Sequence, residues 1–318
     1  MIQERYAIEG QRINTARNAE LTSTTEGLER AMIQDEILEA IALVCSSDMS
    51  ITVDLGSMKG VIPKSEAALP GENSEIKDIA VITRVGKPVC FKVLSITKDS
   101  DGNPYAILSR RAAQLECMRN YIMKLTPGDI IPARITHMEH FGAFVDVGCG
   151  VVSLLSIDSI SVSRISHPSD RFEIGETIYT VVKSIDRDTG RMYVTHKELL
   201  GTWSENAASF SIGTTVTGIV RSIESYGVFV ELAPNLAGLA EYSEGVVAGS
   251  GASVYIKNIL PEKMKIKLVL IDTFPLPPKM IRRYYIDQRT CDRLEYWRYS
   301  PAACPRVVES NFGTVYNI

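Results

Sequence analysis

The strongest constraint on the fold is an internal repeat. Residues 127–150 read PGDIIPARITHMEHFGAFVDVGCG, and residues 212–235 return to the same pattern as IGTTVTGIVRSIESYGVFVELAPN. Each copy has a glycine, an alternating apolar and polar run, an aromatic-Gly-x-Phe-Val-acid turn and a second alternating run. Such alternation is typical of half-buried strands. Repetition of a whole strand pair indicates a tandem array of similar domains.

Residues 127–198, the second repeat, contain the most complete copy. Its strand-like segments are residues 130–138, 142–148, 151–156, 177–186 and 191–199. A loop with a helical turn separates the third segment from the fourth. Five short strands with a helical turn at this place predict a small Greek-key barrel of the OB type.

Two further copies flank this one. Residues 212–272, the third repeat, have the same arrangement with a shorter loop, and residues 38–112, the first repeat, contain a degenerate copy. We expect a linker helix at residues 113–126 and a second linker at residues 199–211. The predicted fold class is therefore mainly β, with three tandem five-stranded OB-fold barrels and short linking helices.

Residues 1–37 form an N-terminal extension that ends in a helix. Residues 1–22 are polar with few large apolar groups, so we expect them to be flexible or loosely attached. A helix should follow, because Ser23 and Glu26 have the spacing of a capping box. The Ser23 hydroxyl would accept a hydrogen bond from a free amide, and Glu26 would reach back.

The composition is that of an ordinary soluble globular chain, with 45% hydrophobic and 23% charged residues. No apolar run approaches the roughly 20 residues that a membrane span needs. The first residues lack the apolar segment of a secretory signal. We therefore expect a cytoplasmic protein that does not bind a membrane.

The sequence lacks catalytic and metal-binding signatures. It has no Gly-x-x-x-x-Gly-Lys, Gly-x-Ser-x-Gly or His-Glu-x-x-His motif, and its six cysteines form no Cys-x-x-Cys pair. His137 and His140 are three apart on an expected strand, so they point to opposite faces. We therefore expect no enzyme, no metal, no cofactor and no small-molecule substrate.

Two phenylalanines lie on strand faces where packing does not require them. Phe144 shares a face with Asp146 rather than with its neighbouring valines, and Phe229 shares a face with Glu231. Both rings are either ordinary core residues or an exposed platform, and their place on a polar face favours the platform. An exposed ring can stack on any unpaired base, which is worth about 1–3 kcal/mol.

The strand motifs resemble a known family. FGAFVDVG followed by VVSLLS, and YGVFVEL followed by AGLAEYS, resemble the RNA-binding domain named after bacterial ribosomal protein S1. KGVIPKSEA, ILSRRAA, HKELLGTW and LAGLAE fit the same pattern. The resemblance covers residues 38–272 and implies a bacterial S1 homologue with three such domains.

The resemblance also implies where RNA binds. In the family, RNA crosses the face of the second and third strands, and an aromatic pair stacks on bases. A His in the third strand, an Asp ending the fourth and an Arg opening the fifth also contact RNA. In the second repeat these positions carry Phe141, Phe144, Asp186 and Arg191, and the His position falls on Leu154. A local ion pair across the turn is an equal alternative for the Asp and the Arg.

The third repeat has Tyr226 and Phe229 as its aromatic pair. Its His position falls on Glu241, whose charge would repel phosphate. The lysines that could offset this charge by tracking phosphates are Lys257, Lys263, Lys265 and Lys267. A solvated strand face is the alternative explanation of this lysine run.

The first repeat and the C-terminal tail are the least defined parts. The first repeat has Met49 and Thr52 in place of the aromatic pair and no matching His; the resemblance implies that such copies dock onto protein. Residues 273–318 form a basic aromatic tail, with 7 basic and 4 acidic side chains. Its Arg, Tyr and Trp side chains either stack on bases or pack against the third repeat.

We therefore predict a non-enzymatic RNA-binding protein of translation. It would hold single-stranded RNA, messenger RNA in particular, near the small ribosomal subunit. The alternative is a protein-interaction adaptor that docks to ribosomal or regulatory proteins. A net charge of −4 argues against coating nucleic acid through bulk positive charge, so RNA binding is expected at local sites.

Overall fold

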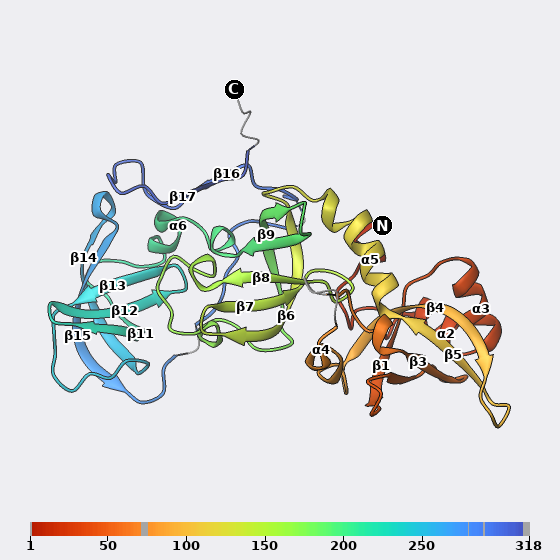
Figure 1. The fold of residues 1–318 in the computed structure, drawn as a ribbon. Helices are drawn as coiled ribbons and strands as arrows, with labels where there is room; N and C mark the ends of the chain where they lie inside the picture. Colours follow the sequence, from red (N-terminus) through yellow and green to blue (C-terminus); the bar gives the residue numbers. More distant parts are fainter. Residues whose placement is uncertain (1, 71–75, 279, 289, 314–318) are drawn as a thin grey trace. The chain divides into compact units, whose positions relative to one another are not determined.

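The protein is described here by a computed structural model (Figure 1). The described residues are 2–70, 76–278, 280–288 and 290–313. They contain three closed five-stranded barrels, which confirms the predicted fold class. The chain forms an N-terminal unit and a C-terminal unit. The N-terminal unit comprises Met1–Leu125 and Asp146–Val152, and the C-terminal unit comprises Thr126–Val145 and Ser153–Ile318.

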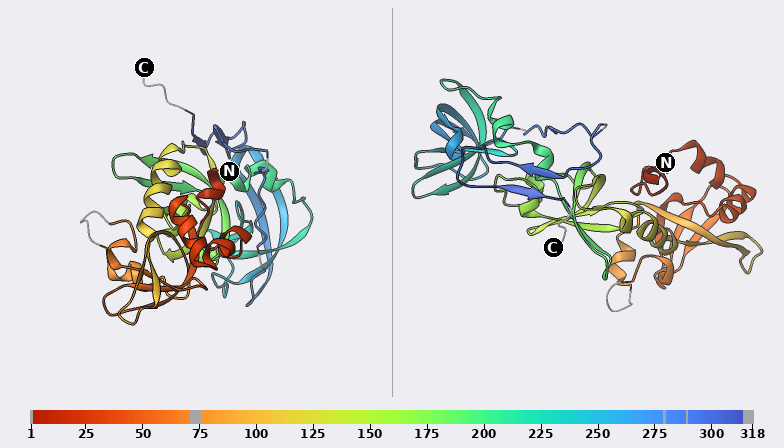
Figure 2. Two further views of the ribbon diagram at one scale, coloured as in Figure 1. Left: turned by 90° about the vertical axis from the view of Figure 1, so that its right-hand side faces the viewer. Right: turned by 90° about the horizontal axis from the view of Figure 1, so that it is seen from above.

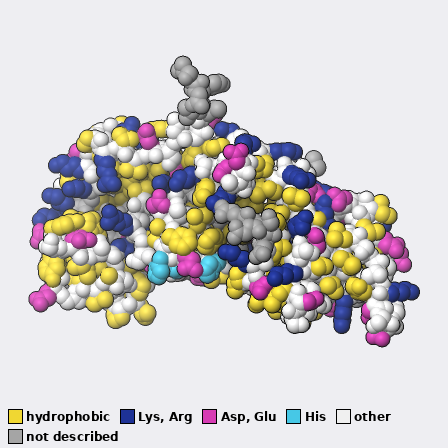
Figure 3. Space-filling model, in the orientation of Figure 1, with side chains coloured by type: hydrophobic (Ala, Val, Ile, Leu, Met, Phe, Trp, Pro, Cys, Tyr) yellow, Lys and Arg dark blue, Asp and Glu magenta, His cyan; other side chains and the backbone are white. Residues whose placement is uncertain are grey.

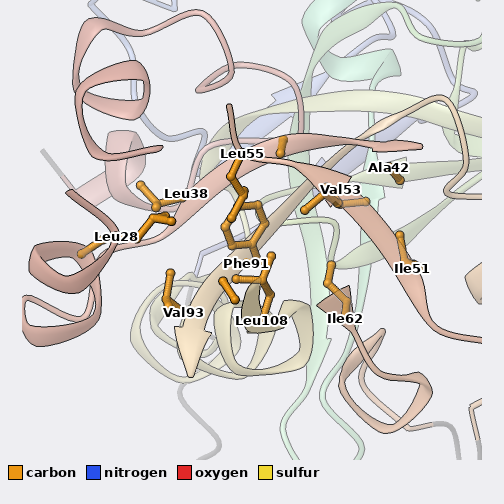
Figure 4. Packing of buried hydrophobic residues seen from close by; sticks show 14 of the residues in the cluster. Leu28, Leu38, Ala42, Ile51, Val53, Leu55, Ile62, Phe91, Val93 and Leu108 are labelled. Carbon is orange, nitrogen blue, oxygen red and sulfur yellow. The ribbon is translucent and has the colours of Figure 1, made fainter. Parts of the chain in front are cut away.

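Barrel one lies in the N-terminal unit. Its strands are β1 (Leu38–Cys45), β2 (Ile51–Asp54), β3 (Lys59–Ile62), β4 (Pro88–Lys98) and β5 (Pro104–Ser109). β1 pairs antiparallel with β2 and β4, and β3 closes the barrel by running parallel to β5. The core forms around Phe91, which is completely buried; Figure 4 shows its ring near Leu38, Leu55 and Leu108.

The N-terminal extension is folded, so the expectation that residues 1–22 are loosely attached was wrong. Its helices are α1 (Ile2–Arg5), α2 (Ala16–Thr22) and α3 (Thr25–Ile33). Figures 1 and 2 show α2 and α3 in red beside barrel one. Ile8 and Leu21 are each only 1% exposed. A few well-placed apolar residues therefore anchor a segment whose composition is mostly polar.

A buried carboxylate on β1 orders the loop before α2. Glu39 is 1% exposed, and its Oε2 accepts hydrogen bonds from the backbone amides of Gly10 (3.1 Å), Arg12 (2.9 Å) and Ile13 (3.0 Å). Burial raises the pKa of Glu39 to about 7. Backbone amides have no signature in sequence composition, which is why this contact could not be predicted.

The sequence predicted Ser23 as the N-cap of α3, but the residue that caps this helix is Thr24. The Thr24 hydroxyl accepts a hydrogen bond from the Gly27 amide at 3.0 Å. Ser23 is instead the residue that caps the C-terminal end of α2, where its amide donates to the Ala19 carbonyl. The remaining helical segments of the N-terminal unit are η1 (Lys64–Glu66), α4 (Asp78–Ile82), α5 (Arg110–Asn120) and η2 (Ile122–Lys124).

Barrels two and three have the same topology. The strands of barrel two are β6 (Ile130–Glu139), β7 (Gly142–Asp146), β8 (Val152–Ser156), β9 (Thr177–Asp186) and β10 (Arg191–Thr195). Those of barrel three are β11 (Thr215–Glu224), β12 (Gly227–Ala233), β13 (Leu236–Ala240), β14 (Gly251–Leu260) and β15 (Lys265–Phe274). Parallel pairs β8–β10 and β13–β15 close the barrels. Short helical segments are η3 (Ile157–Ser159), η4 (Pro168–Asp170), η5 (Lys197–Leu200), α6 (Trp203–Ala207) and η6 (Pro261–Lys263).

The C-terminal tail packs against barrels two and three. It contains β16 (Tyr296–Arg298) and β17 (Glu309–Asn311), drawn in dark blue in Figure 2. Trp297 and Tyr299 are each 6% exposed within the core cluster of barrel three, and the Tyr285 amide donates to the Leu199 carbonyl at 3.0 Å. Buried rings cannot stack on bases, so packing is the correct alternative for these two side chains.

The tail also covers His196 of barrel two. His196 is fully buried, its Nδ1 lies 3.0 Å from the Ile160 carbonyl, and its Nε2 lies 3.3 Å from the Tyr284 hydroxyl. The Phe172 ring meets it edge-on at 5.1 Å. Burial lowers the pKa of His196 to about 3, so this imidazole is neutral in the folded protein at neutral pH.

Within the described residues, every helix is too short or too polar to cross a bilayer.

His196 should make stability pH-dependent. An unfolded histidine binds a proton below about pH 6.5, whereas the folded one stays neutral down to about pH 3. The stabilisation is therefore present above about pH 6.5 and is lost as pH falls, by roughly 1.4 kcal/mol per pH unit from this group. Urea unfolding across this pH range, followed by tryptophan fluorescence, measures the slope. Both tryptophans, Trp203 and Trp297, lie in the C-terminal unit.

His196→Gln should flatten this slope, and His140→Gln, at an exposed site, should leave it unchanged. Equal slopes in the parent and in His196→Gln would contradict the assignment.

Candidate nucleic-acid interface

In barrel two the predicted aromatic pair forms at the start of β7. Phe141 is 55% exposed, and Phe144 is half-buried while every other residue of β7 is buried. Their ring centroids lie 5.9 Å apart in an edge-to-face arrangement. A Cβ at Gly142 would lie 2.5 Å from the Leu155 carbonyl oxygen. Glycine between the rings therefore lets β8 approach closely.

Barrel three repeats this geometry. Tyr226 is 67% exposed, Phe229 is half-buried, and the ring centroids are 6.2 Å apart at 90°. A Cβ at Gly227 would lie 2.4 Å from the Ala240 carbonyl oxygen. The aromatic-Gly-x-Phe pattern thus builds the same two-ring surface twice. Its contact with RNA stays a prediction.

The acids that follow these rings are buried, which corrects the argument that placed the rings on a polar face. Asp146 is 2% exposed, and its carboxylate accepts hydrogen bonds from the amides of Gly148 (2.8 Å), Gly150 (2.9 Å) and Glu9 (2.8 Å). Burial raises the pKa of Asp146, and the nearby charge of Glu9 adds to the effect. An acidic residue within the alternating pattern of this strand is therefore buried and hydrogen-bonded, and it does not mark a face that is exposed to solvent.

Glu231 is the corresponding acid of barrel three and is completely buried. Its carboxylate pairs with Arg171, from the loop between β8 and β9, and with Arg221 of β11 at 2.6 Å. Arg221 also contacts Asp170 at 2.9 Å. Burial raises the pKa of Glu231, and the two guanidinium groups oppose that rise. This ion-pair network joins barrel two to barrel three.

The strand register of barrel three places Phe229 in a row of outward-facing residues. Phe229 pairs with Ser222 on β11 and Leu239 on β13, Leu239 pairs with Lys267 on β15, and Lys267 pairs with Asn258 on β14. None of the five is buried. Of the four predicted lysines, Lys267 is the one that this row brings onto the same surface as the Phe229 ring.

The other predicted lysines lie around that row. Lys257 sits at a bulge in β14 beside Asn258, Lys265 precedes Lys267 by two residues on β15, and Lys263 lies in the η6 turn. All four are exposed. Figure 3 shows Lys and Arg side chains gathered at its left, over barrel three. This charge distribution suits an anionic backbone.

Barrel two has an equivalent row. Leu154 on β8 pairs with Tyr193 on β10, which pairs with Ser184 on β9. Leu154 therefore corresponds to Leu239, since each opens the parallel pair with the fifth strand. The counterpart of Glu241 is then Ser156 and not Leu154, so the two residues assigned to the family His position are not structurally equivalent.

Sequence reasoning missed Tyr193 and Lys183. Tyr193 is 37% exposed and lies two residues after Arg191 on the same face of β10, so strand alternation could have found it. Lys183 occupies a bulge in β9 at the place that Lys257 occupies in β14. Bulges shift the register by one residue without a sequence signature, which explains why Lys183 was overlooked.

Asp186 and Arg191 face each other as cross-strand partners at the ends of β9 and β10. The Asp186 carboxylate accepts hydrogen bonds from the Thr189 hydroxyl (2.6 Å) and the Asp188 amide (3.0 Å). These bonds, the Thr189 hydroxyl first, lower the pKa of Asp186. Asp186 thus shapes the turn, and both side chains remain exposed to solvent.

Histidines border the rings of barrel two. The His137 ring stacks on Phe144 at 6.0 Å with a 20° interplanar angle, and His137 Nε2 lies 2.7 Å from Glu139. His140 meets His167 edge-on at 5.1 Å. Within the described ranges, no three His, Cys, Asp or Glu side chains form a group that could hold a metal ion.

Barrel one lacks the interface. Its row consists of Thr52, Val61, Ile107 and Ser95, which offers neither a ring nor a charge. Met49, at the place of the first aromatic residue, adopts a left-handed backbone with φ of 63°. The first repeat therefore forms the barrel without the surface that the other two share.

Comparisons with known proteins show what this chain is similar to. The family described as S1 RNA binding domain matches residues 124–197, which include all of barrel two. Small ribosomal subunit protein bS1 of Staphylococcus aureus strain COL is 29% identical over 282 residues, covering 84% of this chain and 69% of that protein. The protein of the same name from Staphylococcus epidermidis is 30% identical over 240 residues, covering 74% and 58%.

Among solved structures, a multidomain protein with nucleic acid binding domains from Streptococcus pneumoniae is 15% identical. It covers 74% of this chain and 73% of its own, with a TM-score of 0.24.

Arg171→Ala should destabilise the C-terminal unit by about 3–5 kcal/mol, because it leaves the buried Glu231 with one partner fewer. Urea unfolding followed by tryptophan fluorescence measures this change. Lys263→Ala, at an exposed turn, is the control and should shift stability by no more than about 0.5 kcal/mol. A loss for Arg171→Ala as small as that of the control would show that the network contributes little.

Proposed function

Because the chain belongs to the family of proteins built from tandem S1 RNA-binding domains, we propose that barrels two and three hold single-stranded RNA during translation. The observation that carries the proposal is the repeated two-ring surface. Phe141 with Phe144 and Tyr226 with Phe229 are presented at the same place on two barrels. Bases stack on such rings with little demand on sequence.

We further propose that the ligand is messenger RNA and that the protein works in the cytoplasm beside the small ribosomal subunit. The support is that the relatives from Staphylococcus are small ribosomal subunit proteins. A strand held by stacking must be unpaired, which suits a transcript being presented for translation. The role is proposed as non-catalytic, since stacking and phosphate contacts hold RNA without changing it.

Two sites on one chain explain how weak individual contacts give useful affinity. Each OB fold covers roughly 4–16 nucleotides, so one barrel alone makes few stacks. Once one barrel has bound, the second meets the same strand at high effective concentration. The Glu231 network and the C-terminal tail join the two barrels, which limits the conformational freedom lost on binding.

Phe141→Ala and Phe229→Ala should each weaken RNA binding by about 5- to 150-fold, the equivalent of one stack of 1–3 kcal/mol. Fluorescence anisotropy with a labelled, unstructured RNA of about 30 nucleotides, enough for two OB folds, measures the change. Affinity should also fall as salt is added. Thr52→Ala, at the equivalent place in barrel one, is the matched control and should bind like the parent.

Binding that survives both aromatic substitutions unchanged would rule out the proposed interface.

A further inference from the structure

One position on the shared row differs in chemistry among the three barrels. The residue of the fifth strand that pairs with the third strand is Ile107 in barrel one, Tyr193 in barrel two and Lys267 in barrel three. In each barrel a register shift in the fourth strand lies beside this residue. The strand register therefore shows that these three residues occupy equivalent positions in their barrels, without the use of a sequence alignment.

Tyr193 presents its side chain to solvent from between two buried residues of β10. It is 37% exposed between Met192 and Val194, which are 4% and 1% exposed. It makes no side-chain hydrogen bond, ion pair or ring contact with the residues that the structure describes. An outward tyrosine ring without an intramolecular partner is available to a ligand.

The neighbours of Tyr193 make this surface suitable for bases. Leu154 on β8 and Ser184 on β9 flank it, and none of these three side chains is charged. Arg191 lies two residues away on the same face of β10, and Lys183 occupies the neighbouring bulge in β9. The corresponding row of barrel three contains Lys267, with Lys265 two residues away on the same strand face. At this one position barrel two therefore offers a neutral aromatic ring, and barrel three offers a positive charge.

We propose that Tyr193 is a third base-stacking residue of barrel two, and that barrel three uses Lys267 at the same place to bind the RNA backbone. This inference rests on the proposed function. At this position barrel two then contacts a base, and barrel three contacts a phosphate. This position makes the two sites differ in their sensitivity to salt, because a lysine contact with phosphate releases a counterion and a tyrosine stack does not.

An exchange of the two side chains tests the charge difference. Each phosphate contact contributes about 0.7 to the slope of log affinity against log salt for a single strand. Lys267→Tyr should lower the magnitude of that slope by about 0.7, and Tyr193→Lys should raise it by a similar amount. The measurement is anisotropy with the same unstructured RNA at several salt concentrations. An unchanged slope in Lys267→Tyr would overturn the assignment for barrel three.

Truncation tests stacking by Tyr193 directly. Tyr193→Ala should weaken binding by about 5- to 150-fold, as expected for one lost stack, and Tyr193→Phe should retain it because the ring remains. Tyr255→Ala is the matched control: Tyr255 is 39% exposed but pairs with Thr215 and Val269, away from the row. Thermal unfolding should be alike for Tyr193→Ala and Tyr255→Ala.

The outcomes separate this inference from the proposed function. Parent-like affinity in Tyr193→Ala, together with a loss in Phe144→Ala, would overturn the role of Tyr193 and leave the RNA-binding surface standing. Parent-like affinity in both would mean that barrel two does not stack on RNA. Loss in Tyr193→Ala and in Tyr193→Phe alike would also overturn stacking, because the ring alone should suffice.

Discussion

The parallel pairing of the third and fifth strands is the contact on which the rest of the structure depends. Parallel neighbours cannot be joined by a short hairpin, so the chain must cross over before β10, β15 or β5 can close its barrel. Closure leaves no free sheet edge. It also brings a residue of the fifth strand onto the surface that the aromatic residue of the second strand occupies. Phe229 and Lys267 share that surface although they lie far apart in sequence.

Buried carboxylates, in addition to apolar packing, hold the segments that lie next to the barrels. Asp146 binds backbone amides, and Glu231 binds two arginines from different elements. A buried carboxylate without such partners would be strongly destabilising. Both acids lie two residues after the phenylalanine of the aromatic-Gly-x-Phe pattern, so buried polar contacts hold the strand that presents the rings. A firmly held ring loses little entropy when a base stacks on it.

The tail shows how tertiary structure selects among residues of one type. Trp297 and Tyr299 lie in the core of barrel three, and Tyr284 covers His196, while Tyr296 remains 51% exposed. Interleaved arginines and aromatic rings are equally compatible with packing and with base stacking. Only the position of barrels two and three decides which rings are buried. The tail thus contacts both barrels through buried side chains.

The repeat, its alternation and its turn residues determined the three barrels and the two aromatic pairs, because periodicity and glycine placement are local properties of a chain. Tertiary structure alone decided that residues 2–22 are folded, that Asp146 and Glu231 are buried, that Tyr193 belongs to the row of barrel two and that Lys183 lies at the bulge beside it. The physical reason is the same in each case. Partners such as the amide of Glu9 or the guanidinium of Arg171 come from distant segments, and a bulge moves a strand by one residue without changing its pattern.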